Sequence, residues 1–516
     1  MQQSQSKQQV GGILGFIERI GNKIPDITIL FISAFLLVCV VSAVLAQIHF
    51  NYVHPATGKP IEITNMLSGK ALVDLMSKMV TNYANFPPLS MVIVATLGIG
   101  IADGSGYINT GLKKILSITP KVLITPVVIL VGMLSHLGPD SGYVIIIPIA
   151  AYMFYAVGKH PLAGIAASFA GIAGAFAANY TPSAIDPVIQ GFTQSAAQII
   201  DPGYQVNVLC NYFYAFASTF IVIGACWWVT EKITNPWLWK ACPLDDDLDL
   251  GNENNSSITP SENRAFKIAT AVLLLMLTGL AAALYPADSI LRAPDGVIAS
   301  FKAPIMQSIV SLIFIFAALV GLVYGIACGK FKSPKDVTAA MEEITKTLVQ
   351  LIVFYFFAAQ FLYAFGASNM GALIAVSGAE FLKSLNLPPQ VTVFGIIVFV
   401  ALLNLIITSA SAKWAILAPI FVPMLMAVGI APELTQVAFR VSDSAVNVVT
   451  PMFAFYPLII LYCQKYVKNA GIGTLSSMML PYTIALLVSL TFMLYLFWWL
   501  DIPLGFQADY VYPRRF

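Results

Sequence analysis

Long apolar runs separated by short polar segments dominate this 516-residue chain. A helix needs roughly 20 apolar residues to cross about 30 Å of hydrocarbon, and many of these runs approach that length. The pattern therefore predicts an all-α polytopic membrane protein with nine transmembrane helices. The predicted spans cover residues 27–47, 86–108, 161–200, 209–230, 265–285, 305–328, 340–369, 433–463 and 474–500.

Two further apolar stretches are interrupted by polar residues at their centres. The first, about 122–157, is broken at SHLGPDSG, and the second, about 389–428, is broken at TSASAK. Their arms are short for a complete crossing, so each stretch is expected to be a re-entrant hairpin that enters and leaves on one side. Two of the spans also carry polar breaks, AANYTPSAIDP at 177–187 and RVSDSAVNVVTP at 440–451. In the first of these, two prolines remove backbone donors and break the helix.

The two halves of the chain resemble each other at an offset of 271 residues. PIAAYMFYAVGKHP (148–161) aligns with PIFVPMLMAVGIAP (419–432), with seven identities in fourteen positions. Each half thus has a hairpin followed by a broken span. Counting the spans from a cytoplasmic N-terminus predicts that the first hairpin enters the membrane from the inner side and the second from the outer side. Such an inverted repeat is typical of secondary transporters, whose site lies at mid-membrane among discontinuous helices.

This repeat predicts how the chain is organised. The two halves carry the hairpins, and a polar linker divides them. The predicted segments are a cytoplasmic N-terminus (1–26), the first half (27–230), a cytoplasmic linker (231–264), the second half (265–502) and a C-terminal tail (503–516).

Composition and charge narrow the class of protein. Hydrophobic residues make up 58% of the chain and charged residues only 10%, far below the roughly 25% of soluble domains. Lysine and arginine concentrate in the segments that the span count places inside, which predicts a cytoplasmic N-terminus. The net charge of +2 is too small and dispersed to suggest nucleic-acid binding. The six cysteines lie singly, without a CxxC pair, and are interpreted as packing residues.

Ionisable residues within apolar segments are the first candidates for function, because each costs roughly 2.5–3.5 kcal/mol to insert. They are Asp140, Asp186, Lys413, Arg440 and Asp443. Arg440 and Asp443 are three residues apart on a helix and able to pair. The pair either neutralises itself while locking the break or takes part in substrate or proton handling. Asp140 and Asp186 either cap helix ends or serve function, Asp186 by taking protons.

The second hairpin tip and the unwound turns supply further candidates. Lys413 and the hydroxyl of Ser411 would face a watery cavity, unless the lysine snorkels to the outer surface. Trp414 either stacks on an aromatic ligand or simply packs. Asparagine carbonyl oxygens beside unwound turns suit sodium, although they also stabilise helix ends with no ion present. Three asparagines lie in such places: Asn179, Asn404 and Asn447.

SASAKWAILAPIFVPM (409–424) and FRVSDSAVNVVTPM (439–452) resemble the AbgT family of aminobenzoyl-glutamate transporters, within the ion transporter superfamily. The resemblance runs from about residue 13 to 510 and implies nine spans, two re-entrant hairpins, a homodimer and a bacterial inner-membrane location. Family members are described either as importers of p-aminobenzoyl-glutamate, a folate breakdown product, or as exporters of sulfonamide-type antimetabolites. Carried over by position, the functional residues that the resemblance implies are Asp186, Ser411, Trp414, Arg440, Asp443 and Pro451.

The sequence predicts a secondary active transporter of a small aromatic carboxylate, coupled to a proton or sodium gradient and without a cofactor, and the family resemblance implies p-aminobenzoyl-glutamate or a related compound as the substrate. Arg440 and Lys413 would pair with an anionic group, while Asp186 and Asp443 would bind a coupled proton or shape a sodium site. A proton-driven exporter of sulfonamide-type drugs is the alternative.

Other classes fit less well. No GxxxxGK[ST] phosphate-binding loop occurs, so direct coupling to ATP would require another chain. An intramembrane metalloprotease is disfavoured because none of the four histidines lies in HExxH spacing. A channel is disfavoured because two opposed hairpins indicate alternating access.

Overall fold

The computed structural model describes residues 26–54, 58–137, 142–245 and 258–514. These residues form helices and only two isolated β-bridges, between Val53 and Pro60 and between Ile430 and Val511. Seven helical segments are long and apolar enough to cross a membrane, and the bent pair α17–α18 raises the number to eight. The predicted all-α polytopic fold is confirmed. The count of nine spans and the opposed entry of the hairpins stay predictions.

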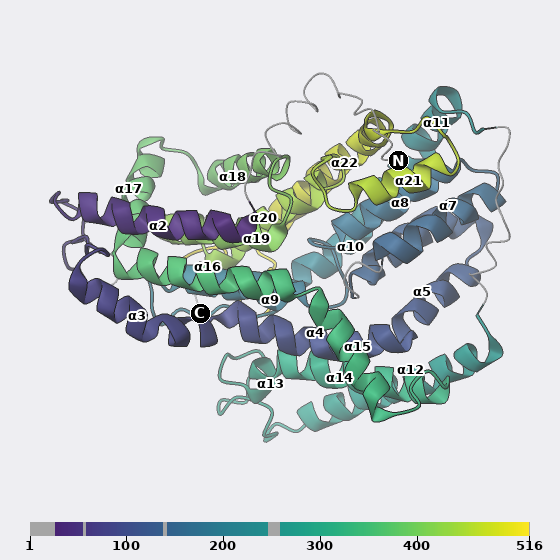
Figure 1. Ribbon diagram of the computed structural model, residues 1–516, viewed down its shortest axis with the longest axis horizontal. Coiled ribbons are helices and arrows are strands. Elements are labelled where there is room, and N and C mark those ends of the chain that lie inside the picture. Colours follow the sequence, from purple (N-terminus) through teal and green to yellow (C-terminus); the bar gives the residue numbers. More distant parts are fainter. Residues whose placement is uncertain (1–25, 55–57, 138–141, 246–257, 515–516) are drawn as a thin grey trace, which may run out of the picture.

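The helices follow one another along the chain as Figure 1 shows. In the first half they are α2 (Ile27–Leu45), α3 (Gly69–Ala84), α4 (Pro87–Ser105), α5 (Tyr107–Ser117), η1 (Lys121–Leu123), α6 (Ile124–Leu134), η2 (Ser135–Leu137), η3 (Gly142–Ile146), α7 (Ile147–Ala156), α8 (Pro161–Gly174), α9 (Ile185–Ala197), α10 (Tyr212–Val229), η4 (Thr230–Thr234) and α11 (Asn235–Ala241). In the second half they are α12 (Pro260–Leu284), α13 (Pro304–Gln307), α14 (Ile309–Ala327), α15 (Pro334–Lys346), α16 (Val349–Ala367), α17 (Met370–Ser384), α18 (Pro389–Asn404), α19 (Ala410–Met426), α20 (Pro432–Val446), α21 (Tyr456–Gln464) and α22 (Ile472–Trp499).

Both predicted breaks of the hairpins and both predicted broken spans occur as interruptions between helices. The first hairpin stretch contains α6 and α7, and the second contains α18 and α19. The broken spans are α8 followed by α9, and α20 followed by α21. Asp140 lies outside the described residues, so its predicted role at the first tip stays a prediction.

One segment differs from its predicted form. The sequence pattern places no helix between the predicted spans 27–47 and 86–108 and leaves that region as a polar connection. In the structure Gly69–Ala84 forms α3, with the Ser68 hydroxyl accepting a hydrogen bond from the Ala71 N–H at 3.3 Å. The helix is amphipathic, and the Asp74–Lys78 pair on its polar side lowers its average hydropathy. Such a helix escapes a search for long apolar runs.

The repeat has a structural counterpart at the turn that leads into each broken span. Gly158 and Gly429 occupy equivalent positions and have φ of 79° and 87°, the left-handed conformation that glycine adopts without strain. The N–H of the following residue bonds to a carbonyl five positions back, Lys159 to Phe154 and Ile430 to Leu425, both at 2.9 Å. Proline then starts the next helix in both halves. The two copies therefore fold alike here, as their sequences predict.

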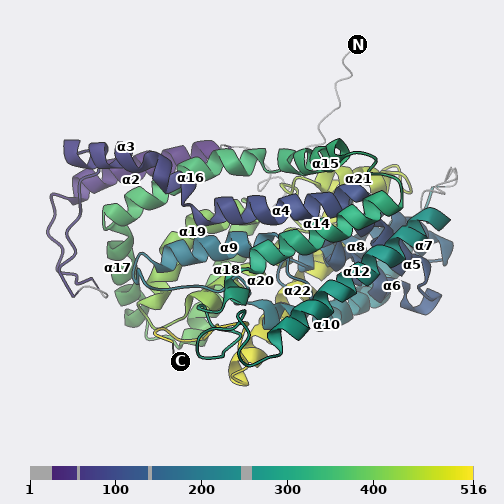
Figure 2. The ribbon, with the colours of Figure 1, turned by 90° about the horizontal axis from the view of Figure 1, so that it is seen from below.

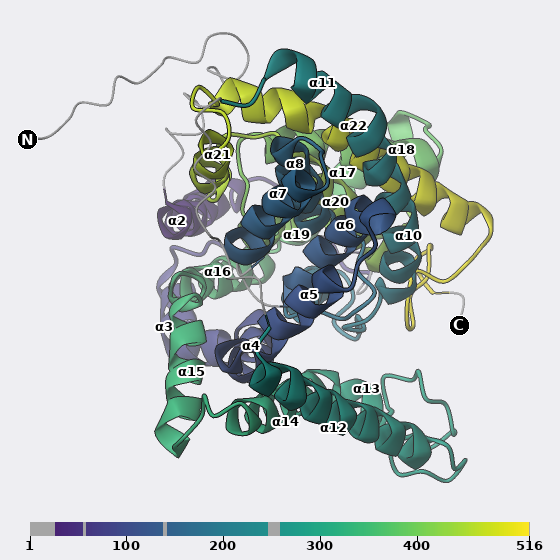
Figure 3. The same cartoon turned by 90° about the vertical axis from the view of Figure 1, so that its right-hand side faces the viewer.

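Close packing joins a peripheral layer to the centre of the molecule. Figure 2 shows α4 and α14 side by side, and Figure 3 shows α12, α13 and α14 as a layer on one side. A Cβ on Gly98 would come within 2.4 Å of the Phe314 carbonyl oxygen, so glycine permits this approach of α4 to α14. The first helix of each broken span lies in the interior of the protein, since every residue of α8 and of α20 is buried. Polar side chains on α20 must therefore find partners within the protein.

Candidate functional site

A cavity of about 370 Å³ lies where the two hairpin breaks meet the two broken spans. This volume is within the roughly 300–1,000 Å³ usual for small-molecule sites. Hydroxyl, amide and carboxylate groups come from the breaks and from α20, and aromatic rings come from the segments beside them. The polar lining residues are Thr96, Ser135, His136, Tyr143, Thr347, Thr408, Ser409, Ser411, Asp443 and Asn447.

Side chains of neighbouring residues form hydrogen bonds with the unwound backbone around the second hairpin break. The Ser409 hydroxyl caps α19 by accepting from the Ala412 N–H at 3.4 Å. The Thr450 hydroxyl donates to the Leu405 carbonyl at 2.8 Å, and Thr408 donates to the Met452 carbonyl at 3.4 Å. The hairpin break and the α20–α21 break thus satisfy each other's polar groups, which unwound backbone at membrane depth requires.

Aromatic rings also line the cavity. Tyr143 stacks on Phe455 with ring centroids 4.5 Å apart and planes 7° apart, and Phe453 lies beside both. Phe176 adds a ring from the end of α8. The sequence reasoning did not select these phenylalanines. It had one usable signal, the repeat alignment that sets Tyr143 opposite Trp414.

Asp186 and Arg440 form a buried ion pair between the two broken spans, with 2.7 Å between Oδ1 and the guanidinium. Asp186 lies in the first turn of α9, and its Oδ2 accepts from the Ser183 N–H at 2.7 Å and the Ser183 hydroxyl at 3.1 Å. The Arg440 Nε donates to the Phe176 carbonyl at 2.7 Å, past the last turn of α8. A carboxylate at a helix start and a guanidinium at a helix end both complement the helix dipoles.

Lys413 and Asp443 form a second buried ion pair, 2.6 Å from Nζ to Oδ1, with both side chains 1% exposed. Lys413 also donates to the Asn404 Oδ1, and Asn404 donates to the Asp443 carbonyl at 3.0 Å. Asn447 donates to the Asp443 Oδ2 at 2.9 Å. The pair therefore joins the second hairpin tip to the end of α20.

Two predictions about these charges are corrected. Arg440 and Asp443 were expected to pair with each other, but each has another partner, because α20 lies between the α8–α9 break and the second hairpin. The alternative that Lys413 snorkels to the surface is wrong, since its side chain is buried and its ammonium is held by Asp443.

The remaining predicted residues lie in different settings around the cavity. Ser411 lines it. Trp414 is fully buried beside it, where the indole stacks on Phe439 at 4.5 Å and donates to the Thr193 hydroxyl at 2.9 Å. Pro451 lies in the unwound segment after α20. The Asn179 Oδ1 accepts from Thr181, while its Nδ2 is buried without a hydrogen-bond partner.

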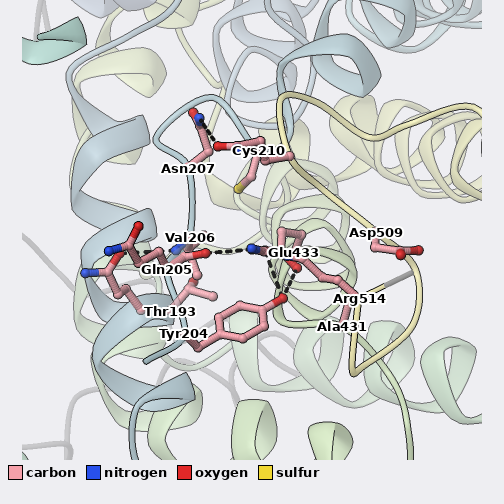
Figure 4. A network of polar contacts seen from close by, with 12 residues as sticks. Thr193, Tyr204, Gln205, Val206, Asn207, Cys210, Ala431, Glu433, Asp509 and Arg514 are labelled. Carbon is pink, nitrogen blue, oxygen red and sulfur yellow. Dashed lines mark hydrogen bonds and ion pairs between the residues drawn. The ribbon is translucent and has the colours of Figure 1, made fainter. Parts of the chain in front are cut away.

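A third buried ion pair, which the sequence reasoning missed, lies at the start of α20. Glu433 is 0% exposed and pairs with Arg514, near the end of the chain. The Tyr204 hydroxyl donates to both Glu433 oxygens, at 3.1 and 2.9 Å. Figure 4 shows Arg514 reaching from the C-terminal segment between Glu433 and the loop of Gln205, whose carbonyl accepts from Arg514 at 2.6 Å. Glu433 lies second in a helix after proline, a position that in sequence is typical of an ordinary helix start.

A model of the AbgT transporter family matches residues 12–512. The chain belongs to this family. It is 32% identical over 511 residues to the p-aminobenzoyl-glutamate transport protein of Escherichia coli K12, covering 99% of this chain and 98% of that protein. The family resemblance predicted from the sequence is thereby confirmed.

Two solved structures of AbgT-family size and fold are similar to this chain. The YdaH transporter of Alcanivorax borkumensis, described as having an unusual topology, is 37% identical with a TM-score of 0.87, over 93% of this chain and 100% of that one. MtrF of Neisseria gonorrhoeae, described as illuminating a class of antimetabolite efflux pumps, is 39% identical with a TM-score of 0.90, over 96% and 100%. The multi-pass membrane fold is thus shared along nearly the whole length of these chains.

Proposed function

We propose that the protein is a secondary active transporter of p-aminobenzoyl-glutamate or a related small aromatic carboxylate. The observation that carries this proposal is the cavity between the hairpin breaks, whose lining combines aromatic rings with hydroxyl and amide groups. The rings suit a benzoyl group, and the hydroxyl and amide groups suit amide and carboxylate groups. The similarity to the E. coli p-aminobenzoyl-glutamate transport protein supports this substrate class.

Arg440 is the group proposed to bind a substrate carboxylate. It lies behind Phe176, which lines the cavity, with its guanidinium 5.2 Å from that ring. Asp186 holds Arg440 in the present conformation. A proton on Asp186 would remove the charge that holds the guanidinium, and a substrate carboxylate could then take its place. Proton binding and anion binding would be coupled through this competition.

We propose the proton as the coupling ion. At the second hairpin break the Lys413 ammonium already occupies the oxygen atoms of Asn404 and Asp443 that would suit sodium. A tethered cation there disfavours a free one by charge repulsion and by occupancy. Sodium remains the second candidate, because the Asn447 Oδ1 is buried without a hydrogen-bond partner near the same site.

Proteoliposomes test the function directly. Uptake of labelled p-aminobenzoyl-glutamate is measured with proton and sodium gradients imposed separately, and accumulation is expected with the proton gradient alone. Asp186→Asn keeps the size of the side chain but removes its charge. This variant is expected to bind substrate with less pH dependence and to lose accumulation against a gradient. Full accumulation by Asp186→Asn would contradict the proposed coupling.

Export of sulfonamide-type antimetabolites is the second candidate function. The similarity to MtrF and the aromatic rings that line the cavity favour it. Membrane vesicles of known orientation separate the two candidates. Under the same ion gradient, an importer moves labelled p-aminobenzoyl-glutamate toward the cytoplasmic side, whereas an exporter moves labelled sulfonamide away from it.

The assembly and location are part of the same proposal: a homodimer in the bacterial inner membrane with a cytoplasmic N-terminus. The distribution of lysine and arginine supports this orientation. Cross-linking in membranes and reporter fusions at the N-terminus would test both points.

A further inference from the structure

A second polar cavity, of about 330 Å³, lies between α9, the loop after it and the α13–α14 segment. It is separate from the central cavity, since the two share no lining residue. It lies beside the C-terminal tail: Asn207, in its lining, donates to the Gln507 side chain at 3.3 Å, and Phe301, also in its lining, lies 5.0 Å from the Arg514 guanidinium. We call the surface formed by this loop and the tail the C-terminal face. Figure 4 shows Gln205, Val206 and Asn207 of the loop in this region.

Side-chain amides dominate the polar lining of this cavity. Its six amide side chains are Gln190, Gln194, Gln198, Gln205, Asn207 and Gln307. A side-chain amide carries both donors and an acceptor without charge, so a cluster of them can bind amide and carboxylate groups alike.

The spacing of three of these glutamines links the cavity to the ion pair of the central site. Gln190 and Gln194 follow Asp186 on α9 at intervals of four residues, and Gln198, four residues further, caps the C-terminal end of the helix. Successive members are neighbours on the helix surface, in a row that winds by about 40° at each step. Twelve residues of helix rise about 18 Å. This row of polar groups thus runs along α9 from the Asp186–Arg440 pair to the C-terminal face.

Some of these amides also hold the loop in place. Gln190 donates to the Val206 carbonyl at 2.7 Å and to the Gln194 Oε1 at 3.0 Å, and Gln198 donates to the Tyr204 carbonyl at 3.2 Å. A purely structural role explains those hydrogen bonds, but it does not explain the side-chain oxygen of Gln190. The Gln190 Oε1 is buried without a hydrogen-bond partner, its side chain is 2% exposed, and the residue lines the cavity. A buried acceptor of this kind favours a ligand or water that donates to it.

We infer that this cavity is a second substrate site, a vestibule that takes an amide-bearing carboxylate on its way between the C-terminal face and the central cavity. The inference rests on the proposed function for the identity of the solute. Gln190 accepts from the substrate amide N–H, and the neighbouring glutamines donate to its carboxylates. The stripe of glutamines on α9 then forms one wall of the route between the two cavities.

Cysteine labelling of purified, detergent-solubilised protein tests the vestibule. Cys242 and Cys328 are first replaced by serine, because the other four cysteines are buried. Gln190→Cys, Gln194→Cys and Gln198→Cys are each treated with a charged, water-soluble methanethiosulfonate. Ala196→Cys is the matched control, since Ala196 lies on the same helix, is 0% exposed and lines neither cavity. Labelling is expected at the three glutamine positions and not at the control, and saturating p-aminobenzoyl-glutamate should slow it.

A second measurement separates the route from loop stability. Gln205 also lines the cavity, and its side chain makes none of the loop hydrogen bonds described above. Gln205→Leu should therefore lower transport about tenfold, the effect of losing one ligand hydrogen bond, while equilibrium binding at the central cavity stays unchanged. Labelling without protection, in a preparation that transports p-aminobenzoyl-glutamate, would overturn the vestibule as a substrate site. Protection of the three introduced cysteines by substrate in the background without Cys242 and Cys328, with no labelling of Ala196→Cys, would support it. A preparation that binds and transports no p-aminobenzoyl-glutamate yet labels at all three glutamine positions would refute the proposed solute, and not the hydrated cavity.

Discussion

The Lys413–Asp443 pair offers the sharpest test of how the site is built. Both side chains are 1% exposed, and the ammonium lies 2.6 Å from the carboxylate. Lys413→Met keeps an unbranched chain of similar length but leaves the Asp443 charge buried with only the Asn447 amide bound to it. Removing one partner of a buried pair costs about 3–5 kcal/mol. Adding Asp443→Asn removes the orphan charge, so the double variant should recover most of that stability.

The assay is SDS titration in mixed micelles, followed by tryptophan fluorescence, with transport measured on the same preparations. Lys346→Met is the control, because Lys346 pairs with Glu343 on the surface with a side chain 69% exposed, and its unfolding should match that of the wild type. The double variant is expected to be stable and inactive. If Lys413→Met alone unfolds like the wild type, the argument from burial is refuted. If the double variant is stable and transports fully, the pair serves structure alone.

Three other changes test separate parts of the molecule. Arg514→Ala leaves the Glu433 carboxylate buried without its cation and should lower the free energy of unfolding by about 3 kcal/mol, measured by the same titration; an unchanged midpoint would contradict the paired geometry. Gly98→Ala places a methyl group against the backbone of α14 and should destabilise by about 1–3 kcal/mol, whereas Gly224→Ala, with open space around it, should not; equal effects would refute the close contact. Tyr143→Ala removes a ring that lines the central cavity and should weaken substrate binding at least tenfold by equilibrium dialysis, and normal binding would remove that ring from the site.

The sequence was sufficient for the helical class, the breaks and most of the buried charges. A membrane requires apolar helices of a certain length and makes buried charge costly, so spans and charged residues within them can both be recognised in the sequence. Asp186, Lys413, Arg440 and Asp443 could be selected on that ground before any contact was known. The repeat alignment likewise located the turns at Gly158 and Gly429.

The partners of those charges could not be predicted, because pairing depends on which elements meet in space. Arg440 finds Asp186 in the other half of the chain, and Lys413 finds Asp443 across a hairpin tip. The rule that residues three apart on one helix can pair does not predict contacts between different helices. The amphipathic helix α3 was missed for a different reason, since its polar side dilutes the apolar signal that marks a span.

The pairing of Glu433 with Arg514 affects the order in which the protein can be completed. The two residues are 81 positions apart, so the ribosome adds Arg514 well after Glu433. The start of α20 is therefore synthesised before the cation that neutralises it. A chain that stops before Arg514 would leave the buried Glu433 carboxylate without its cation and so destabilise the fold. A premature stop codon before Arg514 is then expected to lower protein abundance rather than to yield a stable, slower transporter.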